Sequence, residues 1–501
     1  MATAAALALL ACGCPVGPDF QRPAQPEVTQ YTSSPMPASL RGSAGEPSQA
    51  LLPGQKLAAD WWNLFGSEEL RSVVEEALDG SPNLEAARAT LAQAQELVKV
   101  EEAALYPQLD FGASFERRRV PSGSGTSGST NSDGGSGSSG HGARTGNLFS
   151  LGPTVSYTPD VFGLTRRRIE QQKALARQQG FALAAAWLTL TGNAVSDAIE
   201  IASADAQILA ATDVIEQDQQ VVDLVQKRYQ AGKVARSDLL IAESQLDNDK
   251  TQLPPLEQQM SVARHALAVL VGRPPQQWSP PAFELDNLKL PGELPVTLPS
   301  ELVRQRPDIL AAEASLHAAT ASIGVATAQM YPSITLSASA GLEATSFSSL
   351  FDSDHLTWSA DSGINAPLFH GGALVAGKRA AVEGARASLA QYHQTVLSAF
   401  GQVADTLRGL AHDRDLVEAA RRALDVSSES LALQRLTYHA GKTDLLLLLA
   451  AGRSYNQARV TYARAQAQRY SDTAELFVAL GGGWWNASEL TAQAAVASKA
   501  P

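Results

Sequence analysis

The chain contains two copies of one unit, and this duplication limits the folds that it can adopt. The segment SPNLEAARATL at 81–91 matches RPDILAAEASL at 306–316, and the same offset aligns LDFGAS at 109–114 with ITLSAS at 334–339. Matches that hold one offset across separate segments are typical of an internal repeat. We therefore expect two similar substructures rather than one continuous fold.

A second, shorter offset aligns YQAGK at 229–233 with YHAGK at 438–442. The change of offset requires a longer loop in the first copy, and the Gly/Ser-rich segment 121–146 provides it because such a sequence cannot pack a core. The predicted organisation is a leader with a lipobox over 1–14, an extended N-terminal and equatorial segment over 15–66, a first repeat over 67–271, a Pro-rich linker over 272–300, a second repeat over 301–484 and a flexible tail over 485–501.

Four segments alternate apolar and polar residues with a period of two, and each copy contributes two of them: 108–120, 147–158, 333–342 and 356–368. Strands of about ten residues with this alternation are typical of a membrane β-barrel, with the apolar side chains toward lipid and the polar ones toward a lumen. A soluble antiparallel sheet with one wet face gives the same pattern. Four strands cannot close around a lumen, so a barrel would need strands from several chains.

Two proline-free segments, 164–230 and 373–439, predict very long helices. Each carries an apolar or aromatic residue at every seventh position: Trp187, Ala194, Ile201, Ile208, Ile215, Val222 and Tyr229 in the first copy, and Val396, Val403, Leu410, Val417, Leu424, Leu431 and Tyr438 in the second. A sustained seven-residue period indicates coiled-coil packing. At 1.5 Å per residue, such a helix would span on the order of 100 Å.

Each long helix should end at a glycine turn and be followed by a returning helix. Gly232 and Gly441 suit the left-handed conformation that terminates helices. Ser237 or Asp238 can cap the first returning helix, and Asp444 can cap the second. The pair Pro254-Pro255 should break or kink the first returning helix, because proline removes a backbone donor.

The chain has a formal net charge of −12, which argues against a general nucleic-acid-binding function. No apolar stretch predicts a transmembrane helix. The first eleven residues resemble the apolar core of a signal peptide, although a basic start is lacking. Cys12 and Cys14, the only cysteines, end this stretch. They lack further thiols for a zinc site, and a disulfide between them would close a strained loop. A lipobox with one lipidated cysteine is therefore favoured.

Several motifs together resemble the outer-membrane efflux protein family, of the TolC and OprM type, and in particular its NodT-like lipoprotein branch that serves RND pumps. They are PVGPDFQRP (15–23), DWWNLFGSEELRSVVEEAL (60–78), YPQLDFGAS (106–114), LPPLEQQMSVARHALAVLVG (253–272), YPSITLSAS (331–339), PLFHGG (367–372) and the two Y-x-A-G-K turns. The resemblance covers nearly the whole chain.

The resemblance implies an α+β membrane protein that works as a homotrimer. The three chains would share a twelve-stranded β-barrel, four strands from each, continued by a long α-helical coiled-coil barrel. Such a protein lies in the cell outer membrane, lipid-anchored, and extends into the periplasm. Its partners would be outer-membrane lipid, a periplasmic membrane-fusion adaptor and an inner-membrane RND-type pump, with no nucleic acid and no cofactor.

The implied function is a passive exit duct for drugs or other small toxic compounds, and not an enzyme. Two alternatives remain from the sequence: a duct for type I protein secretion, and a periplasmic coiled-coil lipoprotein or adaptor that forms no channel. The resemblance to the lipoprotein branch disfavours the first of these, and the four alternating strands disfavour the second.

The candidate site residues of a duct are those of its gate, its docking tips and its membrane contacts. Charged residues near the helix turns are gate candidates because rings of charge select ions: Asp223, Asp425, Glu429 and Arg435. A solvated helix face is the simpler explanation for any one of them taken alone. Adaptor docking is expected at Gly232, Lys233, Gly441 and Lys442.

Membrane contact is expected at three places, one of which is Arg166 to Arg168 after the second strand, at the inner headgroup level or as solvated charges. Arg117, Arg118 and Arg119 end the first strand and could pair with lipid headgroup phosphates, or be solvated loop charges. The lipidated residue is Cys14 or Cys12: the preceding Leu9-Leu10-Ala11 favours Cys12, and the spacing to PVGPD favours Cys14. No histidine pattern predicts a metal site, and FDSDH at 351–355 reads more simply as a solvated loop.

Overall fold

A computed structural model describes residues 15–24, 26–28, 30–32, 39–40, 48–120 and 144–486. Both anchor candidates, Cys12 and Cys14, lie outside these residues, as do most of the Gly/Ser-rich loop and of the C-terminal tail. The chain divides into two compact units that cut across the two repeats. Unit 1 comprises residues 1–20, 96–173 and 317–386, and unit 2 comprises residues 21–95, 174–316 and 387–501.

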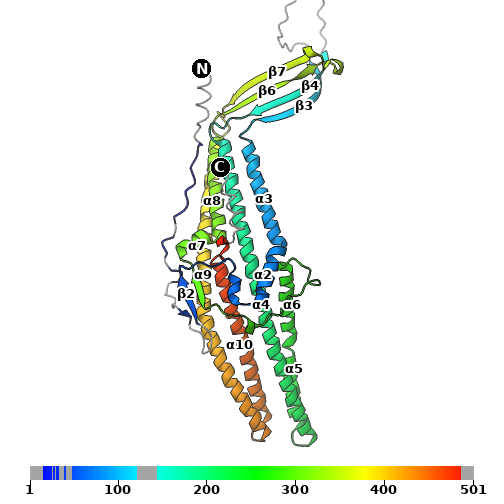
Figure 1. Ribbon diagram of the computed structural model, residues 1–501, viewed down its shortest axis with the longest axis vertical. Helices are drawn as coiled ribbons and strands as arrows, with labels where there is room; N and C mark the ends of the chain where they lie inside the picture. Colours follow the sequence, from blue (N-terminus) through cyan, green and yellow to red (C-terminus); the bar gives the residue numbers. More distant parts are fainter. Residues whose placement is uncertain are drawn as a thin grey trace, which may run out of the picture. The chain divides into compact units, whose positions relative to one another are not determined.

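Unit 1 contains a four-stranded antiparallel sheet in the order β3-β4-β6-β7 (Figure 1). Its strands are β3 (Gln108–Val120), β4 (Arg144–Tyr157), β6 (Ser333–Ala344) and β7 (Leu356–Asn365). Each repeat supplies one hairpin, and β4 pairs with β6 to join the two hairpins. The short helical turns η3 (Phe347–Ser349) and η4 (Ser353–His355) connect β6 to β7.

The sheet has one apolar and one polar face, as the alternation predicts. The strand register places the polar residues of neighbouring strands side by side, and hydroxyl pairs cross from strand to strand at Ser114–Ser150 (2.7 Å) and Ser339–Ser359 (3.0 Å). On the other face, Phe111 is 72% exposed and Trp358 is 78% exposed. Aromatic residues so exposed on one face indicate a surface that meets lipid or another chain.

Four strand boundaries differ from the sequence prediction, and two of them by only one or two residues: β4 ends at Tyr157 rather than at 158, and β6 ends at Ala344 rather than at 342. β4 begins at Arg144 rather than at 147, because the long partner strand β3 continues to pair as far as Val120. β7 ends at Asn365 rather than at 368. Pro367 has no backbone N–H to donate to a ladder, and it restricts the residue before it, so the strand stops ahead of it.

The backbones of β4 and β6 approach each other closely at a pair of glycines. A Cβ on Gly152 would lie 2.2 Å from the carbonyl oxygen of Ala340, and one on Gly341 would lie 2.5 Å from that of Leu151. Glycine is needed here because any side chain would collide with backbone atoms. The junction between the two repeats therefore depends on these two residues.

Helices α4 (Leu164–Gln230) and α9 (Ala373–His439) have 67 residues each and span the predicted ranges. Six of the seven column residues of α9 are buried, and Leu424 is half-buried. Helices α3 (Pro82–Ala103) and α8 (Pro307–Ala328) precede the two hairpins and have 22 residues each. Of the described helices only α8 is long and apolar enough to cross a membrane by length and composition, a test that buried core helices also pass.

The returning helices differ between the copies. The first is split at its prolines into α5 (Arg236–Lys250) and α6 (Leu253–Leu270), whereas the second is one helix, α10 (Leu445–Ala479). Asp444 caps α10 by accepting from the backbone N–H of Leu447 at 2.9 Å. The cap of α5 is not Ser237: the helix begins after Ala235, and Asp238 accepts from the backbone N–H of Ala235 at 3.3 Å.

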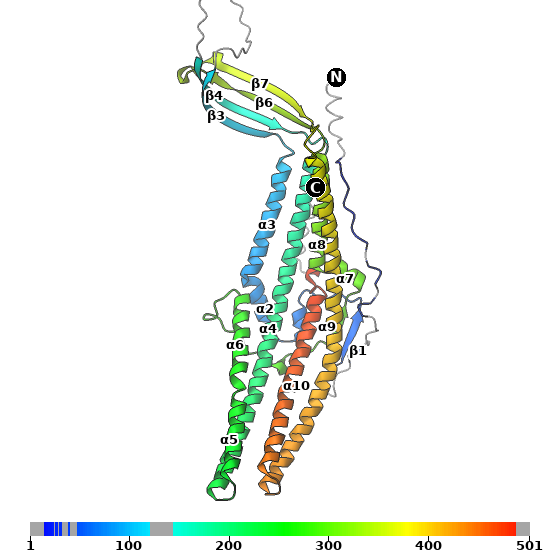
Figure 2. The same ribbon diagram turned by 180° about the vertical axis from the view of Figure 1, so that it is seen from behind.

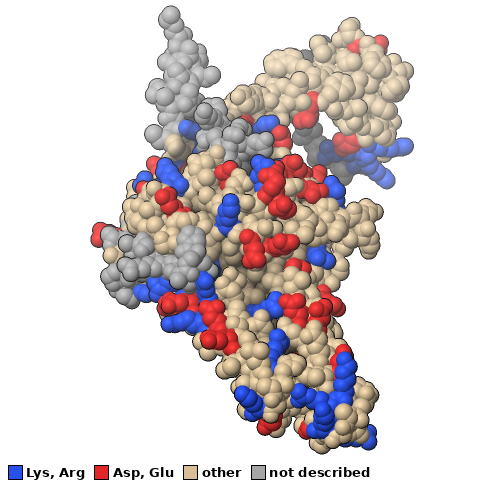
Figure 3. All heavy atoms as spheres, turned by 60° about the horizontal axis from the view of Figure 1, so that its bottom comes forward, with Lys and Arg blue, Asp and Glu red and all other residues tan. Residues whose placement is uncertain are grey.

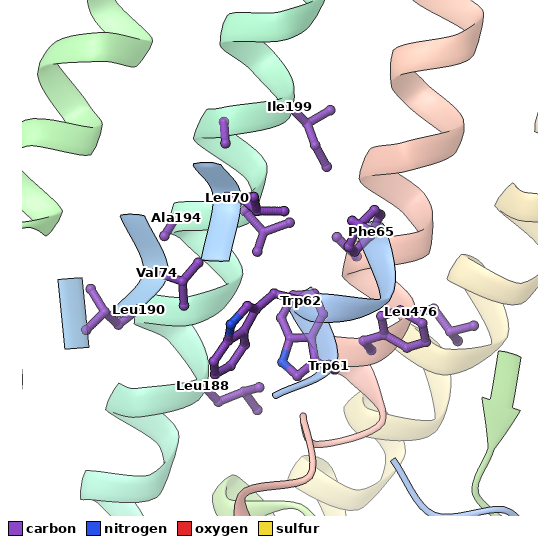
Figure 4. Close-up of a cluster of buried hydrophobic side chains, with 14 of the residues drawn as sticks. Trp61, Trp62, Phe65, Leu70, Val74, Leu188, Leu190, Ala194, Ile199 and Leu476 are labelled. Carbon is purple, nitrogen blue, oxygen red and sulfur yellow. The ribbon is translucent and has the colours of Figure 1, made fainter. Parts of the chain in front are cut away.

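In unit 2, an aromatic turn packs in the core against a turn made of glycines. Figure 4 shows the aromatic side chains of the first turn. The first is η1 (Trp61–Phe65), which leads into α2 (Glu68–Gly80). Trp61 is fully buried, with its ring 5.6 Å from that of Phe477. The second is the Gly481–Gly483 run before η5 (Trp484–Asn486), whose left-handed glycines approach Leu188 and Ala58 too closely for side chains.

A small sheet and two further elements complete unit 2. Strands β1 (Ser39–Leu40) and β2 (Gln49–Pro53) pair antiparallel, and β2 pairs in parallel with β5 (Glu293–Val296) from the Pro-rich linker. The turn η2 (Leu285–Asn287) precedes β5, and α7 (Pro299–Gln305) follows it. The N-terminal segment and the linker therefore form one sheet.

The glycine pair gives a first prediction. We expect Gly341→Ala or Gly152→Ala to destabilise the sheet by about 1–3 kcal/mol, because the new methyl group overpacks a backbone contact. Gly112→Ala and Gly363→Ala are matched controls, since nothing lies within 4 Å of a Cβ at either position. The measurement is the temperature at which the purified folded protein changes its gel migration. Equal midpoints for all four variants would contradict the proposed role of the pair.

Candidate functional site

The turns that end α4 and α9 have the same backbone geometry. Gly232 and Gly441 both adopt a φ of 68°. The following lysines donate their backbone N–H back into the helix, Lys233 to the carbonyl of Arg228 at 2.8 Å and Lys442 to that of Thr437 at 2.9 Å. This bonding terminates a helix through a left-handed glycine. The four predicted tip residues thus lie at exposed turn apices of unit 2.

The side chains of the two tips differ although the backbones match. Lys227, Lys233 and Arg236 are exposed at the α4–α5 tip, and Lys and Arg side chains gather at this end of unit 2 (Figure 3). The offset that aligns the tips places leucine at 436 where the first copy has Lys227. Leu436, Leu446 and Leu447 are 69%, 57% and 51% exposed. The α4–α5 tip therefore exposes more basic side chains and the α9–α10 tip more leucines, although Lys442 is exposed at the second tip as well.

Two arginines link α4 to α9 near the tips, and one of the two links reaches α4 a few helical turns before its tip. Arg435 of α9 donates to the side-chain oxygen of Gln217 on α4. Arg228 of α4 lies 4.4 Å from the centre of the Tyr438 ring and donates to the carbonyl oxygen of Tyr438 at 3.4 Å. Among the four gate candidates, Arg435 is the one that joins two helices in the part of the chain that the structure describes.

The other three gate candidates lie on exposed helix surface. Asp223 accepts from Gln219 of its own helix at 3.0 Å. Asp425 and Glu429 are exposed on α9. These positions are those of solvated charges unless a further chain covers them.

A pair of carboxyl groups is partly buried between α4 and α5, which lie side by side in both views (Figures 1 and 2). Burial, together with the hydrogen bond and charge of Asp249, raises the pKa of Asp218 to about 7 against the opposing charges of Arg435 and Arg453. Gln245 and Gln252 donate to Asp249 at 2.8 Å and 3.0 Å. Two carboxyl groups so close share a proton, because both cannot ionise cheaply.

A second pair has the same character between α9 and α10. Asp413 is 7% exposed, and burial together with Asp472 raises its pKa to about 7, against the charge of Arg469. Gln468 donates to Asp472 at 2.6 Å. Each half of the helical bundle in unit 2 therefore contains one acidic pair.

Neither pair was predicted from the sequence, although a signal exists. Asp218 follows the column residue Ile215 by three positions, and Asp413 follows Leu410 by three. That spacing is the second core position of a heptad, which is normally apolar. Asp197 follows Ala194 in the same way, and burial, with the nearby charge of Glu200, raises its pKa to about 6. An aspartate at a heptad core position is the pattern that marks such a group.

The three arginines predicted to contact lipid headgroups do not share one face of the sheet. The alternation of β3 places Arg117 and Arg119 with Phe111 and Phe115 on the apolar face. It places Arg118 with Ser114 on the polar face. Successive side chains of a strand point to opposite sides, so Arg118 lies on the face opposite to Arg117 and Arg119.

The described residues contain no group of three or more His, Cys, Asp or Glu side chains arranged to hold a metal ion. Within the segment FDSDH, Asp352 and Asp354 carry no ion pair among the described residues, and His355 belongs to the short turn η4.

Comparison with known proteins gives a consistent result. The family model described as "Outer membrane efflux protein" matches residues 73–273 and 298–482. The chain is 31% identical over 481 residues to the pyoverdine export outer membrane protein OpmQ of Pseudomonas putida, covering 95% of this chain and 96% of that protein. It is 28% identical to nodulation protein T of Rhizobium leguminosarum bv. viciae, covering 96% and 93%. The solved outer-membrane channel OprN superposes with a TM-score of 0.80 at 27% identity, covering 94% of this chain and all of that one.

The acidic pairs give a second prediction. The pKa of Asp413 is about 7 in the folded chain, against an ordinary value of 3.8, so between these values the folded chain binds a proton that the unfolded chain has lost. The free energy of unfolding must then fall as the pH rises from about 4 to about 7. We expect Asp413→Asn to remove the part of this slope that Asp413 contributes, while Asp218 keeps its own part, and to stabilise the protein by about 1–2 kcal/mol at pH 8.

The measurement is the midpoint of chemical denaturation, followed by helical circular dichroism at pH 5 and pH 8. Asp415→Asn is the matched control, because Asp415 lies on the same helix in an exposed pair with Arg414. A pH dependence that is the same in both variants would show that the buried pair does not titrate as described.

Proposed function

We propose that this chain, which belongs to the outer membrane efflux protein family, forms a homotrimeric exit duct that passes small toxic compounds through the outer membrane. The family is one of transport channels, and both relatives and the OprN structure align over nearly the whole chain. The observation that carries the proposal is the four-stranded sheet with one apolar and one polar face, continued in the chain by two 67-residue helices.

The trimer follows from the edges of the sheet. Strands β3 and β7 are the outer strands, and each has one side without a partner strand among the described residues. Unpaired strand edges pair with other strands or aggregate, and a closed barrel removes them. Pairing β3 of one copy with β7 of the next gives twelve strands from three copies. Their apolar faces would meet lipid and their polar faces would line the lumen.

The partners are a periplasmic membrane-fusion adaptor and an inner-membrane pump of the RND type. The exposed tips at Gly232, Lys233, Gly441 and Lys442 are the surface for the adaptor. The lipid anchor is one of Cys14 and Cys12, and Arg117 and Arg119 would pair with lipid phosphates.

A small compound is favoured over a secreted protein as the cargo. The relative from P. putida is named for pyoverdine export, and neither reported relative is named for protein secretion. An adaptor or coiled-coil lipoprotein without a channel is disfavoured by the two-faced sheet, which such a protein would not need.

The gate is proposed to be held by the link between α4 and α9. Arg435 and Gln217 join these helices within a few turns of the tips, and Arg228 adds a second link through Tyr438. Separating α9 from α4 would widen the space between helix pairs. Asp223, Asp425 and Glu429 would act only as rings of charge in the trimer.

The third prediction concerns this gate. We expect Arg435→Ala to raise the leak conductance of the resting channel about tenfold, because a lost hydrogen bond from a charged group is worth on the order of 1.5–3 kcal/mol. Conductance in planar bilayers measures the effect. Arg422→Ala is the matched control, because Arg422 lies on the same helix, is exposed and, among the described residues, pairs only with Glu418 of that helix. Equal conductance of Arg435→Ala and Arg422→Ala would reject the link as the gate.

The fourth prediction tests the class of protein. The folded chain should migrate as a heat-modifiable trimer in the outer-membrane fraction and form pores in bilayers. Recovery as a monomer in the periplasmic fraction would refute the duct and favour an adaptor.

A further inference from the structure

The N-terminal segment Pro15–Phe20 is held by one buried arginine of α4. Arg167 has a side chain only 4% exposed. It donates from Nε to the carbonyl of Val16 at 3.1 Å, and from Nη2 to the carbonyl of Gly17 at 3.2 Å and to Asp19 at 2.8 Å. Its Nη1 donates to Glu170 of its own helix at 2.6 Å. The guanidinium thus directs three hydrogen bonds to a segment 150 residues away in sequence.

The site around Arg167 is shaped for this segment. A Cβ on Gly17 would lie 2.5 Å from the Cα of Gly324 on α8, so the two backbones touch. A Cβ on Gly324 would in turn lie 2.7 Å from the Arg167 side chain. Both glycines are therefore needed to bring the segment, α8 and Arg167 together.

Both ends of the segment are fixed as well. The backbone N–H of Val16 donates to the carbonyl of Phe162 at 3.2 Å, and a Cβ on Gly163 would collide with Pro15 at 2.5 Å. At the other end, Phe20 stacks on His317 with ring centres 4.3 Å apart. Residues 162 and 163 join β4 to α4, so Pro15 is held at the strand–helix junction of unit 1.

We propose that Pro15–Phe20 is a latch that seats on Arg167 and holds the lipid anchor at the strand–helix junction of unit 1. The inference rests on the proposed lipid anchor, because the latch begins one residue after Cys14. Pro15, which is held at the junction, follows Cys14 by one residue and Cys12 by three, so an anchor on either cysteine would lie close to a fixed point. Releasing the six latch residues would add a slack tether of about 13 Å. Arg167 is therefore a positioning residue for the anchor.

Proteolysis tests whether the latch is closed. Chymotrypsin cleaves after aromatic residues, and stacking on His317 protects the bond between Phe20 and Gln21. In lipid vesicles, the Phe20–Gln21 bond of Arg167→Ala should be cleaved at least about tenfold faster than that of wild type. The reason is that the variant loses the charge-assisted hydrogen bonds that hold the segment closed. Arg167→Lys should be cleaved at a rate between those of wild type and Arg167→Ala, because lysine keeps the charge but lacks the planar fork of donors. Arg168→Ala, an exposed neighbour, should match wild type.

A double-mutant cycle tests whether the latch acts on the anchor. The temperature at which the folded form is lost on gels is measured for Arg167→Ala in the natural chain and in a Cys12→Ser/Cys14→Ser background. If the latch positions the lipid, Arg167→Ala lowers this temperature more in the lipidated chain than in the unlipidated one. Equal losses in both backgrounds would overturn the proposal, because the arginine would then serve the fold alone.

Two further results separate the possible failures. If Arg167→Ala does not fold, Arg167→Lys and Asp19→Asn replace it in both the cleavage assay and the double-mutant cycle. Asp19→Asn should still fold, because the Asp19 side chain is 86% exposed. Cleavage of Arg167→Ala at the rate of Arg168→Ala overturns the latch. Mass spectrometry that finds no acyl group on the N-terminal peptide refutes the lipid anchor, and with it the positioning role, whereas the cleavage rates still report the latch contact.

Discussion

The seven-residue packing of two 67-residue helices is the constraint on which unit 2 depends. A column that repeats every seven residues drifts by about 20° per heptad around a straight helix, so a helix of this length keeps the column against its neighbours only by supercoiling with them. The columns bring α4 and α9 against their returning helices, and the glycine turns set where the chain reverses. The tips and the links between helices follow from this packing.

Aspartates at three core positions of the heptads work against the same packing. Asp197, Asp218 and Asp413 stand where an apolar side chain would stabilise the helices more, and burial raises the pKa of each. Two of them face a second carboxyl group and an arginine on a neighbouring helix. Polar residues at such positions specify register and weaken the interface. The proposed gate would benefit from this balance, because a fully apolar core would hold the helices together more strongly.

The sequence predicted the helices better than the contacts between them. The bounds of α4 and α9 were predictable because glycine and proline end helices locally, and the alternation of the strands defined both faces of the sheet. The early start of β4 was not predictable, since it depends on pairing with β3. The acidic pairs were missed because their partners, Asp249 and Asp472, come from separate returning helices. The bonds of Arg167 to Val16 and Asp19 likewise join distant parts of the chain.

The duplication separates what the backbone requires from what function requires. Both tips have the same glycine conformation and the same return hydrogen bonds, so these features are what reversing a long helix demands. The side chains have diverged on that common backbone, to Lys227 at one tip and Leu436 at the other. Folding does not require lysine at one tip and leucine at the other, because both residues are good helix formers at exposed positions. A partner that meets both tips must therefore present two chemically different surfaces, or meet each tip in a different way.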